Sequence, residues 1–248
     1  MIDRETLRSI ARTKDISNMS FAEQDYFQEI IMLGVSREAP QLTFKGGTAL
    51  CKFHGLNRFS EDLDFAGEIA KGDARRISSY LENFGYPTEV SLRTTRSGSL
   101  LTFVTEGFLY QGTPEGLGRV QMDVGRGAVS DAEWTPFFSL YPDVPMFGLR
   151  VMTLEEIMAE KVRALLVRRK ARDAYDIWFL LNKGVGMDLE LVEEKLTLYG
   201  IELGPALLGK ALDECERNWH RELRPLLSQI PEFDGVRREV RKGLGTRR

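Results

Sequence analysis

Residues 44–65 read FKGGTALCKFHGLNRFSEDLDF, and this stretch decides how the chain is interpreted. A β-like run ends at the glycine pair Gly46 and Gly47, and the pattern predicts a short helix over residues 48–54 and a second strand over residues 62–66. Two glycines allow a sharp turn close to a ligand, and the helix that follows presents unpaired N–H groups to anions. The stretch therefore predicts a turn that binds phosphates.

The second strand of this stretch carries two carboxylates, Asp62 and Asp64. Because side chains alternate along a strand, both are expected on one face, with Leu63 and Phe65 on the other. Carboxylate and phosphate oxygens are ligands that Mg²⁺ prefers, and two such cations can stabilise an in-line phosphoryl displacement. Mn²⁺ is an alternative metal, and the Thr48 hydroxyl is a further donor for the phosphates. Together these features predict an enzyme that moves a nucleotide.

A third carboxylate is expected from residues 119–124, which read RVQMDV. Val120, Met122 and Val124 alternate with polar residues, which predicts a strand with Asp123 on its polar face. Asp123 is the candidate for a third metal ligand or for the base that accepts a proton from the attacking hydroxyl.

Composition restricts the class of protein. The chain has 248 residues and a formal net charge of -3, so any polyanion must bind a local patch rather than a uniformly basic surface. Cys51 and Cys215 do not form a disulfide framework. No apolar run approaches the roughly 20 residues that a membrane span needs. The N-terminus lacks a signal-peptide core, which indicates the cytoplasm and no membrane partner.

The chain divides near residue 150 into a mixed α/β part, residues 1–150, and a helical part, residues 151–248. In the first part we expect β-like runs near residues 88–95, 100–109 and 118–124, followed by a loop over residues 130–147. Helices are expected over residues 3–14, 20–36, 71–84, 153–169, 173–182, 189–199, 205–221 and 232–242. This order predicts an α+β fold, a mixed sheet flanked by helices and followed by a C-terminal helical bundle.

The helical part holds the densest group of basic residues. Residues 153–180 read TLEEIMAEKVRALLVRRKARDAYDIWFL, in which Lys161 and several arginines precede Asp173 and Asp176. Such a run is typical of a solvated amphipathic helix with ion pairs one turn apart, or of a surface that binds phosphates. The residue pattern leaves both readings open.

The order strand, Gly-Gly-Thr, helix and strand with D-x-D resembles the signature of the polymerase-β-like nucleotidyltransferases. The segments KGGTAL and RFSEDLDF, followed by the segment EKVRALLVRRKARDAYDIWFL, resemble the corresponding motifs of the AbiEii/MenT family of nucleotidyltransferase toxins. The resemblance covers most of residues 40–180. It implies an NTP and Mg²⁺ as co-substrate and cofactor, and transfer of a nucleotide to the 3′ acceptor end of tRNA, which blocks translation and growth.

The resemblance also implies roles for particular residues. Lys161 would hold the triphosphate, and Asp176 would either orient Lys161 or contact the nucleotide sugar. The implied catalytic set is Asp62, Asp64, Asp123, Lys161 and Asp176, with the first three as metal ligands. The implied phosphate-binding set is Gly46, Gly47, Thr48, Arg58 and Lys161. Candidates for RNA contact are Arg163, Arg168, Arg169 and Arg172.

Further expectations concern partners and rival functions. The family implies a toxin with an antitoxin protein from the same operon, a role in phage defence, and a helical part that completes the active site; we expect a monomer. One rival is a nucleotidyltransferase that modifies a small molecule, as aminoglycoside-modifying enzymes do. Another is a non-catalytic protein that binds a nucleotide or a partner on the same scaffold.

Overall fold

The computed structural model describes residues 1–127 and 129–245, which form two compact units. The first unit consists of Met1–His54 and Phe59–Met152. The second consists of the short segment Gly55–Arg58 together with the chain from Thr153 onward. Each unit is described by itself below.

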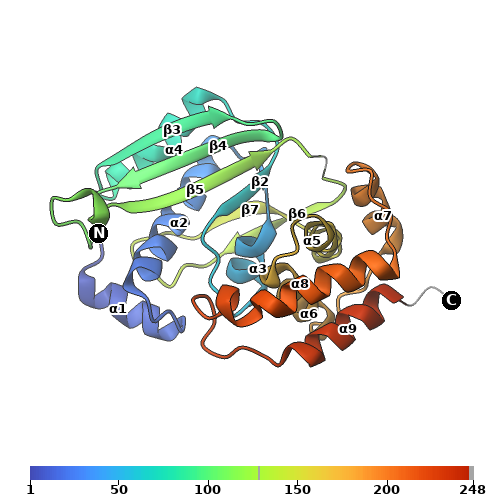
Figure 1. The fold of residues 1–248 in the computed structure, drawn as a ribbon. Helices are drawn as coiled ribbons and strands as arrows, with labels where there is room; N and C mark the ends of the chain where they lie inside the picture. The colour runs from blue at the N-terminus through green and yellow to red at the C-terminus, as the bar shows by residue number, and fades with distance from the viewer. Residues whose placement is uncertain (128, 246–248) are drawn as a thin grey trace. The chain divides into compact units, whose positions relative to one another are not determined.

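The first unit is built on a mixed β-sheet (Figure 1). In the part of the chain that the structure describes, seven strands form one sheet in the order β3-β4-β5-β2-β1-β7-β6. The pairs β2–β5 and β1–β7 are parallel, and the other neighbours are antiparallel. The strands are β1 (Thr43–Lys45), β2 (Leu63–Ala66), β3 (Thr88–Thr94), β4 (Gly98–Thr105), β5 (Gly118–Gly125), β6 (Ala132–Phe137) and β7 (Phe147–Met152).

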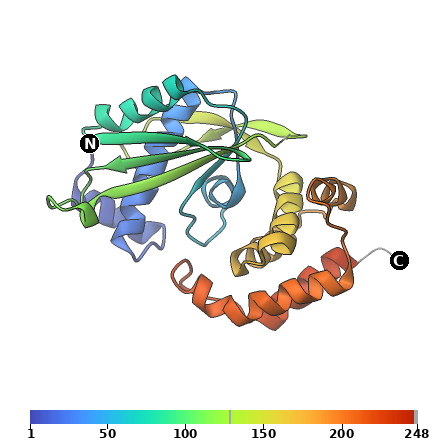
Figure 2. The same cartoon turned by 45° about the horizontal axis from the view of Figure 1, so that its top comes forward.

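Helices pack against one face of this sheet (Figure 2). The long helix α2 contacts β5 and β7 and also packs against α1 and α4, so most of its central residues are buried. The α4 helix contacts β3 and β4. The helical elements of the unit are α1 (Arg4–Thr13), α2 (Met19–Glu38), α3 (Gly46–His54), α4 (Lys71–Asn83) and the 3₁₀ turn η1 (Pro114–Gly116).

Alternation along the strands assigns the two faces of the sheet. In β5, Val120, Met122 and Val124 are buried, whereas Gln121 is exposed and Asp123 is half-buried. In β2, Leu63 and Phe65 are buried on the same side as the β5 valines. The opposite face, which we call the open face, therefore carries the polar residues of the unit's central strands.

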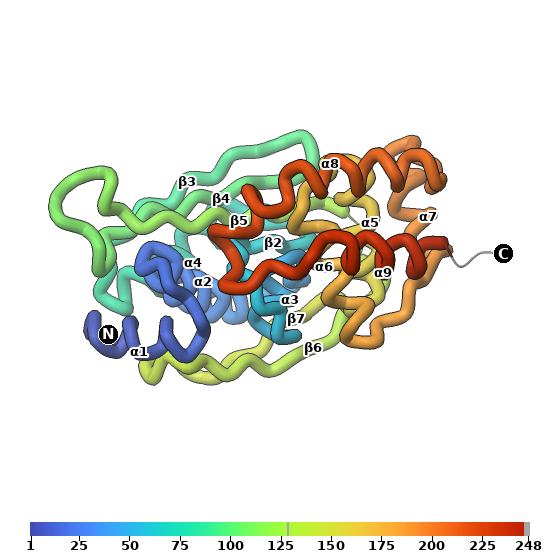
Figure 3. Tube along the Cα trace, turned by 60° about the horizontal axis from the view of Figure 1, so that its bottom comes forward, coloured from blue at the N-terminus to red at the C-terminus, as the bar shows by residue number. Residues whose placement is uncertain are grey.

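The second unit is helical, as Figure 3 shows for the chain after residue 153. Helix α6 is central, because it packs against α5, α8 and α9, and α7 packs against α5. Its helices are α5 (Leu154–Arg168), α6 (Ala171–Asn182), α7 (Leu189–Thr197), α8 (Pro205–Leu223) and α9 (Phe233–Gly245). Arg169, in the left-handed conformation at φ 53°, ends α5 and allows the chain to turn into α6.

The predicted α+β architecture is confirmed, with two differences in its elements. The predicted loop over residues 130–147 is wrong in part, because β6 occupies Ala132–Phe137. This strand contains Pro136, and β6 is at the edge of the sheet, where proline is tolerated. The helix predicted from Thr48 begins two residues earlier, at Gly46. None of the described helices is long and apolar enough to cross a bilayer.

Candidate functional site

The Gly-Gly turn and the D-x-D strand lie directly against each other. Gly46 has a φ of 76°, in the region that favours glycine, and begins α3 immediately after β1. A Cβ at this position would lie 2.2 Å from Oδ2 of Asp64. The Asp64 carboxylate therefore rests on the Gly46 backbone, and a side chain at residue 46 would displace it.

Thr48 has a different role from the one that its sequence position suggested. Its side chain is buried, and its Oγ1 donates a hydrogen bond to the backbone carbonyl of Asp62. The hydroxyl thus joins the first turn of α3 to the start of β2, instead of facing a phosphate. The α3 helix starts at this turn, and the N–H groups of a first helical turn are the kind of donor that binds an anion.

Asp64 and Asp123 stand next to each other on two parallel strands. In the register of the sheet Asp64 of β2 is opposite Asp123 of β5, and Lys45 of β1 is opposite Asp64. Neighbouring strands are about 4.8 Å apart, so the three side chains form one row on the open face. The structure thus brings together the second carboxylate of the D-x-D pair and the predicted third acid.

The charges in this row perturb one another. Burial and the neighbouring charge of Asp64 raise the pKa of Asp123, and the Lys45 ammonium lowers it. Two like charges side by side are costly unless a cation or a proton lies between them. A half-buried carboxylate with a raised pKa is typical of a functional site rather than of a packing position.

Lys45 is a site residue that our sequence reasoning missed. Its signal was present, because it alternates with the buried Phe44 and directly precedes the Gly-Gly turn. Alternation alone placed it on the face that carries Asp64. What the sequence did not show is that β1 pairs with β2, and this pairing brings the ammonium beside both acids.

The Asp64–Asp123 pair suits a divalent cation whose other ligands come from the substrate. Among the described residues, no group of three or more His, Cys, Asp or Glu side chains is arranged to hold a metal. The expected three-acid set of Asp62, Asp64 and Asp123 therefore stays a prediction. Mg²⁺ commonly uses one or two carboxylates together with substrate phosphates and water, so the Asp64–Asp123 pair fits it. Asp62 is half-buried at the start of β2.

In the second unit, Asp176 of α6 holds two cations. Arg58 donates to it through two hydrogen bonds, Nε to Oδ1 at 2.6 Å and one terminal nitrogen to Oδ2 at 2.7 Å. Lys161 Nζ lies 2.6 Å from the same Oδ2. The Asp176 side chain is 0% exposed, and the Arg58 and Lys161 side chains are 2% and 8% exposed. Of the two roles left open for Asp176, this geometry favours orientation of Lys161, because no Asp176 oxygen reaches solvent.

The buried cations control the ionisation of Asp176. Burial on its own would raise its pKa, but the charges of Arg58 and Lys161 outweigh burial and lower the pKa to about 2. The neighbouring Asp173 is buried too, with two hydrogen bonds of 2.7 Å from Arg168 and with Lys161 Nζ at 3.7 Å. Each of the two carboxylates thus has one arginine and Lys161 as partners within the unit.

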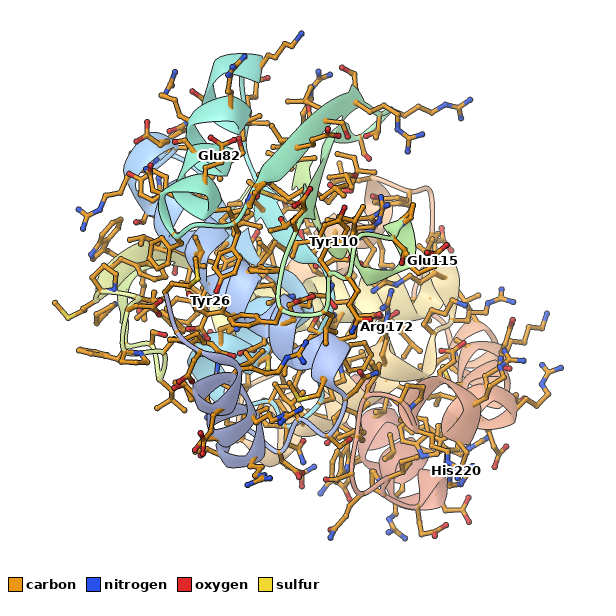
Figure 4. All side chains as sticks on the ribbon, turned by 90° about the vertical axis from the view of Figure 1, so that its left-hand side faces the viewer. Tyr26, Glu82, Tyr110, Glu115, Arg172 and His220 are labelled. Atoms are coloured by element: carbon orange, nitrogen blue, oxygen red, sulfur yellow. The ribbon has the colours of Figure 1, made fainter. Side chains whose placement is uncertain are left out.

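Most of the arginines that we expected to bind phosphates already have protein partners. Arg58, a predicted NTP contact, is committed to Asp176. The guanidinium of Arg163 stacks 4.7 Å above the Tyr199 ring, and Arg169 lies 3.3 Å from Glu214. Arg168 is bonded to Asp173 but is 44% exposed. Arg172, labelled in Figure 4, and Arg163 are the two of these arginines with no ion pair to any other described residue.

A mixed sheet with a glycine turn against paired carboxylates is the arrangement of a nucleotidyltransferase. The sequence profile of the family described as nucleotidyl transferase AbiEii toxin, type IV toxin–antitoxin system, matches residues 31–239. This match spans most of the chain, and the chain belongs to that family. It is therefore a nucleotidyltransferase toxin of a type IV toxin–antitoxin system, as the sequence resemblance predicted.

Solved structures agree on the fold. MenT4, a nucleotidyltransferase toxin from Mycobacterium tuberculosis H37Rv, matches with a TM-score of 0.66 at 20% identity, over 100% of this chain and 91% of that one. JHP933 from Helicobacter pylori matches with a TM-score of 0.60 at 19% identity, over 99% and 92% of the two chains. Identities this low show a shared fold alone. Among curated proteins no relative matches significantly.

Proposed function

We propose that the protein transfers a nucleoside monophosphate from an NTP to the 3′ end of an RNA, the acceptor stem of tRNA, and thereby blocks translation and growth. The observation that carries this proposal is the Asp64–Asp123 pair, in register on parallel strands and resting against the Gly46 backbone. An anion-binding turn beside two carboxylates suits a reaction that joins an oxygen to a phosphate.

In the proposed reaction the 3′ hydroxyl oxygen attacks the α-phosphorus. A new P–O bond forms, the bond to the β-phosphate oxygen breaks, and pyrophosphate leaves. Asp123 accepts the hydroxyl proton, a role that a carboxylate next to the Asp64 carboxylate on the parallel strand can take. The N–H groups at the start of α3 hold the phosphates. Mg²⁺ or Mn²⁺, held by Asp64 and Asp123 with Asp62 as a further ligand, would supply charge neutralisation.

Lys161 is proposed to balance the charge that develops on the leaving pyrophosphate. Asp176 acts as a positioning residue, because it holds the Lys161 ammonium at 2.6 Å. Arg58, which shares that carboxylate, orients Asp176 in turn.

The biological setting follows from the family. We propose that the protein acts in the cytoplasm as a monomer, that an antitoxin protein of the same operon counteracts it, and that the pair serves phage defence. NTP is the co-substrate, and Arg172 and the exposed Arg168 remain candidates for RNA contact.

The decisive experiment is incubation with each α-labelled NTP, total tRNA and Mg²⁺, with the Asp64→Asn variant as control. We expect one NTP to label an RNA band in the wild-type reaction and no band with the variant. A wild-type protein that labels no RNA, or a variant that labels RNA as well as the wild type, contradicts the proposal. A parallel reaction with aminoglycosides detects the small-molecule rival, since label would then appear in the antibiotic.

A further inference from the structure

Three arginines lie at one end of the sheet of the first unit, and one of them, Arg93, is in the row of Asp64 and Asp123. Arg93 is at the end of β3, Arg96 is in the turn to β4, and Arg126 follows β5. We call them the hairpin arginines. All three are exposed, and among the described residues none of them has an ion-pair partner. This distinguishes them from Arg58 and Arg169, which face acidic side chains.

Backbone contacts hold this corner of the sheet together. The β3–β4 turn is closed by a hydrogen bond from Thr95 N to the carbonyl of Gly98, at 2.9 Å. Arg126 N donates to the carbonyl of Ser97 at 2.8 Å, so the turn is bonded to the chain that leaves β5. At Gly98 a Cβ would lie 2.0 Å from the Val124 carbonyl oxygen. The turn and the end of β5, at the same end of the sheet in Figure 1, are therefore fixed side by side.

The strand register connects this corner to the candidate site. Arg93 is opposite Leu100, Leu100 is opposite Asp123, and Asp123 is opposite Asp64. All four residues share the open face, and Arg93 is two strands from Asp123, a backbone separation of about 10 Å. A flexible arginine side chain spans much of that distance. Within the first unit, this row therefore joins the Asp64–Asp123 pair to Arg93, whose charge has no ion-pair partner among the described residues.

The next row of the open face is polar but uncharged. Ser91, Thr102 and Gln121 are opposite one another on β3, β4 and β5, and each can donate a hydrogen bond to an oxygen. The acidic Glu89 belongs to the row beyond, further from the hairpin arginines. A ligand that follows this face from the arginines to Asp123 meets donors and positive charge, which is the chemistry that binds phosphodiesters.

We infer that the hairpin arginines hold the phosphodiester backbone of the acceptor RNA and position its 3′ end at the Asp64–Asp123 pair. This inference rests on the proposed function and replaces part of the RNA surface that the sequence suggested, because Arg163 and Arg169 have partners in the second unit. Arginine suits the task, since its planar guanidinium bonds phosphate oxygens in pairs and its charge displaces counterions. The contacts carry no base information, so they set position rather than sequence preference.

The test uses the full-length protein with Arg93, Arg96 and Arg126 all changed to glutamine. Binding of total tRNA is measured by fluorescence anisotropy over a series of salt concentrations, together with KM for tRNA and for the NTP. We expect the salt slope of log K to fall by ~2, from about 0.7 for each lost contact to a single strand. KM for tRNA should rise about tenfold or more, with KM for the NTP unchanged.

A matched control removes the same charge elsewhere on the first unit. Arg8, Arg12 and Arg75 are exposed residues of α1 and α4 without ion pairs among the described residues, and their triple glutamine variant should bind tRNA like the wild type. If the hairpin variant does not fold, the single Arg96→Glu change in the turn gives the same test. Unchanged tRNA binding and KM in a folded hairpin variant overturn the inference while wild-type labelling leaves the proposed function intact. A wild-type protein that neither binds nor labels RNA overturns both.

Discussion

Acidic side chains have opposite surroundings in the two units. In the first, Asp64 and Asp123 are adjacent like charges, half-buried, with Lys45 beside them. In the second, Asp173 and Asp176 are fully buried, and each is bonded to an arginine. Like charges side by side destabilise the folded state. A buried cluster in which the charges are paired destabilises the folded state only when one partner is removed. The comparison indicates that the Asp64–Asp123 pair serves the reaction, and that Asp173 and Asp176 hold their basic partners in position.

The largest effect should come from the first row. Asp64→Asn is expected to reduce nucleotide transfer by about 10²–10³-fold or more, because one of the two carboxylates proposed to hold the cation that stabilises the reacting phosphate is lost. Its free energy of unfolding should stay the same or increase, since the change removes repulsion from Asp123. Steady-state labelling and urea unfolding measure the two effects. A clear loss of stability in this variant would place Asp64 with the structural acids.

Asp176→Asn should show the opposite pattern. Removal of one partner from a buried ion cluster costs about 3–5 kcal/mol, because the buried Arg58 and Lys161 lose the carboxylate charge that they share. Urea unfolding measures the loss. The matched control is Asp213→Asn, whose ion pair with Arg237 is at the surface, with Asp213 58% exposed. That variant should lose less than about 1 kcal/mol, and equal losses in the two variants contradict the comparison.

The pH dependence of stability tests the same cluster. Asp176 has a folded-state pKa of about 2 against an ordinary value of 3.8, so its contribution is complete above about pH 4. The contribution falls as the pH drops towards 2, where the folded state also takes up the proton. The unfolding free energy of the wild type should decline over this window more steeply than that of Asp176→Asn. Acid titrations followed by circular dichroism would show parallel curves if the cluster contributed nothing.

Gly46→Ala probes the contact between the turn and the carboxylate row. A Cβ there would meet Asp64 Oδ2 at 2.2 Å, and the φ of 76° disfavours alanine. We expect transfer to fall by about 100-fold, because misplacement of a reacting group by about 1 Å has that effect, and stability to fall by about 1–2 kcal/mol. Gly55→Ala is the control, with a φ of 77° but no atom within 4 Å of the added Cβ. It should show the stability loss with most of the transfer activity retained.

The smallest effect is expected from Lys45→Gln. Lys45 lowers the pKa of Asp123, so its removal should raise that pKa further. Since the proposed reaction needs Asp123 ionised, the acid limb of the kcat profile should move to higher pH. Rates measured from pH 5 to 9 detect the shift. Lys71→Gln, an exposed change on α4, should leave the limb in place. A limb that moves to lower pH would contradict the assigned sign.

Local patterns identified much of the fold. Period-two alternation located β3, β4 and β5 within a few residues, because one face of each strand is less exposed than the other. Helical periodicity did the same for α5 and α6. The edge strand β6 was missed, because exposure on both sides and Pro136 removed the alternation that marks a strand.

For the site, the sequence determined which side chains could do the chemistry, and only the tertiary structure decided which of them meet. The glycine turn, the D-x-D pair and Asp123 were recognisable because turn geometry and alternation are local properties. Strand order and register are not local, and they alone place Lys45 and Arg93 in the row of Asp64 and Asp123. In the same way, only the packing of residues 55–58 with α6 turned Arg58 from a phosphate candidate into a partner of Asp176. A side chain's charge follows from its type, but the partner that satisfies it follows from what the fold brings near.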